Sequence, residues 1–272
     1  MRRFKLTNGA GRNFDLMRRD AFLNAPSGLG FSRSVSSLLV GDAWLTQEDN
    51  PQQSEASGDM VFAGYEQYKE FCEFIAEGGL SLWYAPLSVW YSAPCIITSI
   101  GKTEIETSRR LVCPIVFLLE SAWTRKEQIA AESQSGNKIY PYTYPYIYGS
   151  QYGGSYVVQN NTQRDAALRL TIFGPIENPS WSVTNRGSVQ RGRVMAAVPM
   201  GNKIVIDSTD GAMELAEYTN ENVFVQDLYG AGDFSTVRFV KAGQGENIIS
   251  FDQEGGSTIN ASVEVTYYAD SV

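Results

Sequence analysis

The sequence predicts a mainly β protein: an α+β N-terminal domain with one helix against antiparallel strands, followed by a C-terminal antiparallel β-sandwich. Three observations support this prediction. Only the stretch beginning at Tyr65 has a clear helical periodicity, and strand-like segments follow it. From residue 156 onward the chain consists of short apolar segments separated by turns. The length of 272 residues suits one large domain or two medium ones.

The first residues predict a β-hairpin. Apolar residues alternate with polar ones on both sides of a glycine-rich segment, at Phe4, Leu6, Phe14 and Leu16. The intervening Asn8–Gly11 has the composition of a turn. A phosphate-binding glycine loop leads into a helix N-terminus, whereas a strand follows here. We therefore expect a turn and no phosphate site.

Two apolar segments come next, followed by a polar one. Val35–Val40 predicts a strand, and Trp44 and Leu45 continue the apolar pattern. Gln47–Gly58 has a single apolar residue, Ala56, so we predict an exposed loop there. The carboxylates in and beside it lack the spacing of an EF-hand, and we expect them to be solvated. These carboxylates are Glu48, Asp49, Glu55 and Asp59.

The stretch Tyr65–Trp123 provides the framework of the first domain. Apolar residues near a spacing of 3.6 predict an amphipathic helix with a stripe formed by Tyr65, Tyr68, Cys72 and Ile75 and widened by Phe71 and Phe74. Gly78-Gly79 ends this helix, because glycine enters the left-handed region without cost. Strands are expected at Leu80–Tyr84, Cys95–Ile97 and Leu111–Leu119. One helix against antiparallel strands forms an α+β layer.

Two unusual segments separate the halves. Thr124–Asn137 is polar and predicts a loose linker, whereas Ile139–Tyr156 alternates tyrosine with proline, isoleucine and glycine. The second segment suits either a stacking platform for bases or sugars or a strap between domains. We favour the strap, because only Lys138 supplies positive charge beside the tyrosines. We expect a first domain over residues 1–135, a Tyr/Pro-rich strap over 136–158, and a second domain over 159–272.

The remaining chain predicts an antiparallel β-sandwich. Short strand-like segments are separated by turns such as Asp210-Gly211 and Gly243–Asn247, and no helical stretch interrupts them. The expected strands include Leu168–Ile172, Lys203–Asp207, Asn222–Leu228, Thr236–Val240, Ile248–Phe251 and Ser262–Tyr268.

The composition excludes several classes of function. The net charge of −8 argues against non-specific binding to a phosphate backbone. The absence of histidine removes His-based triads and the commonest metal ligand. The three cysteines, Cys72, Cys95 and Cys113, lie in apolar contexts and predict buried free thiols in a reducing compartment. We expect no signal peptide, because Arg2 and Arg3 are not followed by an apolar segment, and no membrane insertion, because no run of about 18 apolar residues occurs. We also expect no metal and no cofactor.

A series of segments carries a resemblance to a known family. They are LTNGAGRNFDL from Leu6, GLGF from Gly28, YEQYKEFCEFIAEGGLSLWYAP from Tyr65, IGKTEI from Ile100, LVCPIVFLLESAW from Leu111, the strap YPYTYPYIY, GPIENPSW from Gly174 and AGQGENIISF from Ala242. With these segments in this order, nearly the whole chain resembles the distal tail protein family of bacteriophages with long, non-contractile tails.

The resemblance implies a structural role in a phage or phage-derived tail. The first domain would be a ring-forming module related to tail-tube proteins, and a hexamer would surround a central channel. The second would be a galectin-like β-sandwich at the periphery. The ring would join the tail tube to the tail-tip or baseplate proteins and to receptor-binding proteins. DNA would pass through without specific binding, and the protein would reside at the virion tail tip after assembly in the bacterial host cytoplasm.

A closed ring needs head-to-tail contacts between different edges of neighbouring copies. We regard the polar segment Gln47–Gly58 and the aromatic residues Trp83, Tyr84, Trp90 and Tyr91 as candidates for inter-subunit contact. This is a hypothesis, because interface and core aromatics look alike in a sequence.

Two other functions are alternatives to a structural role as a ring in a phage tail. A carbohydrate-binding module on a phage-type tail particle would stack a sugar on Trp181, although the segment NPSW places this residue at the start of a strand, where tryptophan is more often a core residue than a ligand platform. An enzyme would need a nucleophile with a base, or paired carboxylates in an apolar frame, and we identify neither. We therefore expect no catalytic residues.

Overall fold

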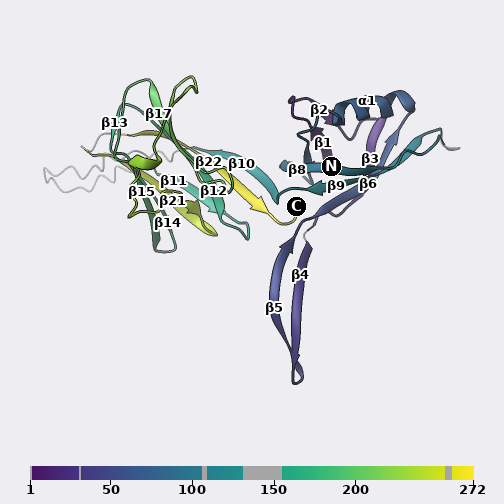
Figure 1. Cartoon of the computed structure of the whole chain (residues 1–272), viewed down its shortest axis with the longest axis horizontal. Coiled ribbons are helices and arrows are strands. Elements are labelled where there is room, and N and C mark those ends of the chain that lie inside the picture. Colours follow the sequence, from purple (N-terminus) through teal and green to yellow (C-terminus); the bar gives the residue numbers. More distant parts are fainter. Residues whose placement is uncertain (1, 31, 106–108, 131–154, 255–258) are drawn as a thin grey trace, which may run out of the picture. The chain divides into compact units, whose positions relative to one another are not determined.

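The computed structural model describes residues 2–30, 32–105, 109–130, 155–254 and 259–272, which divide into two compact units (Figure 1). Unit 1 comprises Met1–Arg125 and Ala269–Val272, and unit 2 comprises Lys126–Tyr268. The division therefore falls before the predicted boundary at residue 135. Residues 136–154 of the predicted strap lie outside the described residues, and Tyr156–Val158 begin a strand of unit 2.

Unit 1 is an antiparallel sheet with one helix. Its strands pair in the order β3-β6-β9-β8-β7-β1-β2. Their bounds are β1 Arg3–Thr7, β2 Asn13–Asp15, β3 Ala21–Ser27, β6 Glu55–Phe62, β7 Ser81–Ala85, β8 Tyr91–Ile100 and β9 Leu111–Leu119. The helix α1 spans Tyr65–Ile75, and two further strands, β4 (Ser32–Val40) and β5 (Ala43–Gln52), pair only with each other.

The predicted helix is confirmed, but its buried face is centred elsewhere. Phe71 and Phe74 are its buried residues, whereas Tyr65 is exposed. The Phe71 ring lies 5.1 Å from that of Phe14 and 5.6 Å from that of Phe62. Phe71 thus contacts both the first hairpin and β6. Phenylalanine takes the core positions because its ring is entirely apolar, whereas the hydroxyl group of tyrosine stays near water.

The predicted first hairpin is also confirmed, with Leu6 opposite Phe14. Its turn packs against the end of α1: the Gly9 amide donates to the Gly78 carbonyl at 2.8 Å. A Cβ at Gly79 would lie 2.9 Å from the Gly9 Cα, so this close approach requires glycine. The buried Asn8 side chain reinforces the junction by donating to the Phe74 carbonyl at 3.3 Å.

Two predicted loops are strands instead. Gln47–Gln52 is the second half of β5, and Glu55–Gly58 begins β6 and pairs with β9. The predicted linker at Thr124 belongs to β10 (Trp123–Ile129), in which Thr124 pairs with Ser92 of β8. Backbone pairing satisfies the polar main chain whatever the side chains are. Polar strands of this kind therefore escape detection from hydrophobic pattern alone.

Unit 2 is the predicted β-sandwich, although the expected strand at Thr236–Val240 is irregular and the strand expected over Asn222–Leu228 is confined to Phe224–Asp227. One sheet has the order β19-β18-β17-β12-β22, with β20 also pairing with β12, and the other has the order β11-β21-β14-β15. The bounds are β11 Tyr156–Asn160, β12 Ala166–Phe173, β13 Ile176–Glu177, β14 Ser180–Asn185, β15 Ser188–Arg193, β16 Ala197–Val198, β17 Asn202–Asp207, β18 Glu214–Thr219, β19 Phe224–Asp227, β20 Lys241–Ala242, β21 Gly245–Asp252 and β22 Asn260–Ala269. Both sheets contribute to one core, with Leu170 and Val263 from the first and Trp181 and Phe251 from the second.

We predict that Phe71→Ala lowers the free energy of unfolding of unit 1 by about 3–5 kcal/mol, because it removes a fully buried ring. Urea denaturation followed by circular dichroism measures the change. Lys69→Ala is the matched control on the same helix, since its side chain is 79% exposed, and should change stability by less than about 0.5 kcal/mol. An unchanged midpoint for Phe71→Ala would contradict the docking of α1.

Candidate functional site

The strands β4 and β5 form a ribbon, here called the arm, that projects from the rest of unit 1 (Figure 1). A tight turn at Gly41-Asp42 connects them, with Val40 opposite Ala43. A two-stranded ribbon without a third strand is only marginally stable in water. The arm is therefore a segment that gains stability when another surface covers it.

The end of the arm is apolar on both of its faces. We call it the arm tip: Leu38, Leu39, Val40, Trp44 and Leu45, all exposed, with Trp44 at 69%. Leu39 lies opposite Trp44, and Leu38 lies opposite Leu45. Since successive residues of a strand point to opposite faces, these two cross-strand pairs cover both sides of the ribbon. An apolar surface of this kind marks an interaction site.

The arm also carries carboxylates beside its tip. Asp42 lies in the turn and Glu48 lies on β5, and both are exposed. Neither forms an ion pair within the residues that the structure describes. The arm thus presents apolar side chains together with uncompensated negative charge.

A second surface combines cations with indole rings. The register places Lys5 opposite Trp83, with both on the face of the sheet opposite Phe4 and Leu6. The Lys5 Nζ lies 4.6 Å from the centroid of the Trp83 ring and 5.2 Å from that of Trp90. The Arg3 guanidinium lies 4.9 Å from the Trp90 ring. Cation–π attraction holds these charges in place.

The turn between β7 and β8 extends this second surface with Leu87, which is 79% exposed. We call the whole surface the basic–aromatic patch: Arg3, Lys5, Trp83, Leu87 and Trp90. Among the described residues, no carboxylate forms an ion pair with Arg3 or Lys5. The patch therefore offers apolar surface and available positive charge.

The four aromatic residues singled out in the sequence fall into two pairs. Trp83 and Trp90 meet in the basic–aromatic patch, as described above. Tyr84 instead stacks on Phe4 at 4.5 Å, and Tyr91 packs against the core of unit 1. Tyr84 and Tyr91 thus also pack within unit 1, and contact of any of the four residues with a neighbouring copy stays a prediction.

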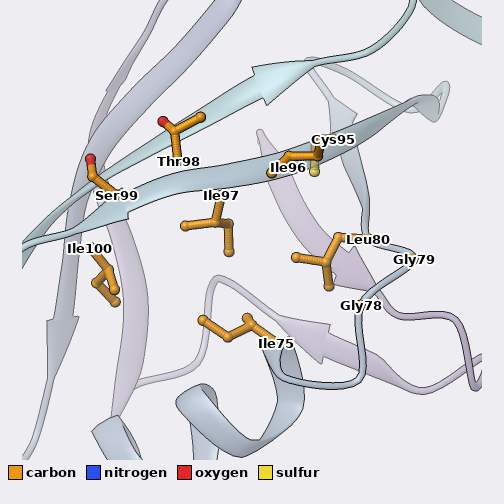
Figure 2. Close-up of a pocket in the computed structure, with 10 residues that line it drawn as sticks. All are labelled: Ile75, Gly78, Gly79, Leu80, Cys95, Ile96, Ile97, Thr98, Ser99 and Ile100. Carbon is orange, nitrogen blue, oxygen red and sulfur yellow. The ribbon is translucent and has the colours of Figure 1, made fainter.

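An apolar groove of about 370 Å³ lies between the end of α1 and strand β8 (Figure 2). Ile75 and Leu80 point into it from one side, and Ile97 and Ile100 lie on the other. The partner strand β7 pairs with β8 only as far as Pro94. Beyond Pro94, no described strand pairs with this edge of β8. The groove has no charged lining residue.

Cys95 and Cys113 lie in environments that disfavour the reactive thiolate. Burial raises the pKa of the Cys95 thiol to about 12, and burial also raises that of Cys113. Both are therefore protonated thiols at neutral pH, which are poor nucleophiles. No group of three or more potential metal ligands occurs in the described part of the chain. No helix among these residues is long and apolar enough to span a bilayer.

The candidate sugar contact, Trp181, lies in the core of unit 2 with only 2% of its surface exposed. Its indole nitrogen donates to the Arg238 carbonyl at 3.1 Å. The ring covers Gly192, directly opposite on β15, where a Cβ would lie 2.4 Å from the indole. An indole enclosed in this way has no free face on which a sugar could stack.

Comparison with known proteins matches most of unit 1 to a protein family and the whole chain to solved structures. Residues 3–119 match the N-terminal domain of the distal tail protein family. The whole chain is similar to a chain of the activated baseplate of phage p2, at 15% identity with a TM-score of 0.66 and full coverage of both chains. It is also similar to the Dit protein of phage SPP1, at 10% identity with a TM-score of 0.63, covering 97% of this chain and 98% of that one. No curated protein sequence matches at a significant level.

We predict that Gly192→Ala destabilises unit 2 by about 1–3 kcal/mol, because the added methyl group would overlap the indole ring of Trp181. Gly230→Ala is the matched control in the same unit, since no atom lies within 4 Å of the position of its Cβ. Urea denaturation followed by tryptophan fluorescence compares the two. Equal stability of both variants would contradict the packing of Trp181 on Gly192.

Proposed function

We propose that the chain is a phage tail-hub protein, on the premise that residues 3–119 match the N-terminal domain of the distal tail protein family. Copies of it form a ring, a hexamer, at the end of the tail tube. The family assignment of unit 1 is the observation that carries this proposal. The solved relatives support it, because one belongs to a phage baseplate and the other is described as a hub adsorption apparatus.

The arm supports assembly from identical copies. Its tip exposes apolar side chains on both faces, so a lone chain leaves them in water at a free-energy cost of roughly 25 cal/mol per Å². A projecting element that contacts a different surface of the next copy makes a head-to-tail interface. Repeated contacts of this kind close into a ring when the rotation between copies permits it.

We propose that the ring connects the tail tube protein to tail-tip and receptor-binding proteins, at the tail tip of a virion assembled in the host cytoplasm. DNA would pass through a central channel without specific binding. The net charge of −8 supports this, because an acidic protein does not retain a polyanion non-specifically. The role would be structural rather than catalytic.

Sugar binding receives no support from the described residues. Trp181, the candidate platform in unit 2, is a core residue, so its replacement would destabilise unit 2. The tail-hub function is therefore the one we retain.

We predict that the purified chain forms rings of about six chain masses by light scattering and negative-stain imaging, as closed cyclic assemblies do. Replacing Leu39 and Trp44 together by alanine should shift the protein to smaller species. Both side chains are exposed, so the stability of the single chain should change by less than about 0.5 kcal/mol per site.

Phe234→Ala provides the control for these measurements, because Phe234 is an equally exposed aromatic residue of unit 2, at 73%. This variant should assemble like the parent chain. Unchanged rings in the arm variant would show that the arm is not an assembly contact. A chain that stays monomeric at high concentration, alone and with its tail partners, would refute the ring.

A further inference from the structure

We propose that the arm tip of one copy docks on the basic–aromatic patch of a neighbouring copy. This inference rests on the proposed function and goes beyond it by naming the surface that receives the arm. The arm projects away from the rest of unit 1, and its tip is exposed to solvent (Figure 1). A second copy is the occupant to which we commit, because the same chain carries both complementary surfaces.

Apolar surface is the first point of complementarity. The arm tip exposes Trp44 and Leu45, and the patch exposes Leu87 in the same β7–β8 connection as the half-buried Trp90. Aromatic side chains near the centre of an interface account for much of its binding energy. Contact between these two surfaces removes exposed apolar area from both partners at once.

Opposite charge is the second point of complementarity between the arm tip and the patch, and it is the more selective of the two. The arm carries Asp42 and Glu48 without ion-pair partners, and the patch carries Arg3 and Lys5 without carboxylate partners. The indole rings already hold the two cations, so little side-chain freedom is lost when an acid approaches. Opposite charges on facing surfaces select the partner and raise the rate of encounter.

The groove beside α1 is the rival receiving surface, and it lacks this complementarity. Its lining comprises only uncharged residues, and the last turn of α1 has no basic residue (Figure 2). It therefore offers no counter-charge to Asp42 or Glu48. The basic–aromatic patch accounts for both the apolar and the charged features of the arm, whereas the groove accounts only for the apolar one.

Disulfide trapping tests the contact directly in the full chain. We expect Leu45→Cys combined with Leu87→Cys to give intermolecular cross-links under mild oxidation at high protein concentration. Leu45→Cys with Ile96→Cys, which lies at the groove, is the matched comparison. The parent chain measures the background from its native cysteines, of which Cys95 and Cys113 are buried. Cross-linking only at Ile96, or at neither position, overturns the proposal.

Charge reversal gives a second, independent readout. Arg3→Glu with Lys5→Glu should weaken association about tenfold or more, as lost or reversed interface charges do. Asp42→Lys with Glu48→Lys in the same chain should restore most of it. Thermal melting checks that each variant is folded. Association that is unaffected by the patch variant, or further weakened when both surfaces are reversed, overturns the proposal.

The outcomes separate this proposal from the ring itself. Rings without arm-to-patch cross-links would leave the hub function intact and overturn the docking. Arm-to-patch cross-links in open chains or dimers, without closed rings, would support the docking and count against the ring.

Discussion

The packing of Phe71 against Phe14 and Phe62 is the contact on which unit 1 depends. It joins α1 to the first hairpin and to β6, which are far apart in the sequence. The hairpin contains β1, so this contact also positions Arg3 and Lys5 of the basic–aromatic patch. The strand β6 follows the arm directly, so the same contact anchors the base from which the arm projects.

The exposed apolar surfaces of unit 1, on the arm and along the edge of β8, have the same physical origin. Strand pairing and helix docking build the interior of unit 1, but the arm has only two strands, and the edge of β8 that pairs with β7 has no partner strand beyond Pro94 among the described residues. Apolar side chains at such places stay in contact with water in a single chain. A protein that functions as one member of an assembly can keep them exposed, because its neighbours provide the cover.

Local pattern predicted the elements whose side chains have a clear period. The helix, the first hairpin and sandwich strands such as β12, β17 and β22 were expected from the alternation or the helical spacing of apolar residues, whereas the strand expected at Thr236–Val240 does not form. The polar strands at Gln47–Gln52 and Thr124 were missed, because main-chain pairing with a distant or adjacent strand forms them. The clustering of Lys5 with Trp83 and Trp90 depends on the register between β1 and β7. This register could not be predicted from local sequence patterns.

By itself the sequence determined the fold class, the acidic charge, the absence of histidine and the order of motifs that indicates the family. These properties follow from composition and local spacing. Only the tertiary structure decided that Trp181 is enclosed while Trp44 is exposed, and that Trp83 lies under a lysine while Tyr84 faces the core. All four are aromatic residues in strand-like segments, and burial is a property of what packs around a residue rather than of the residue itself.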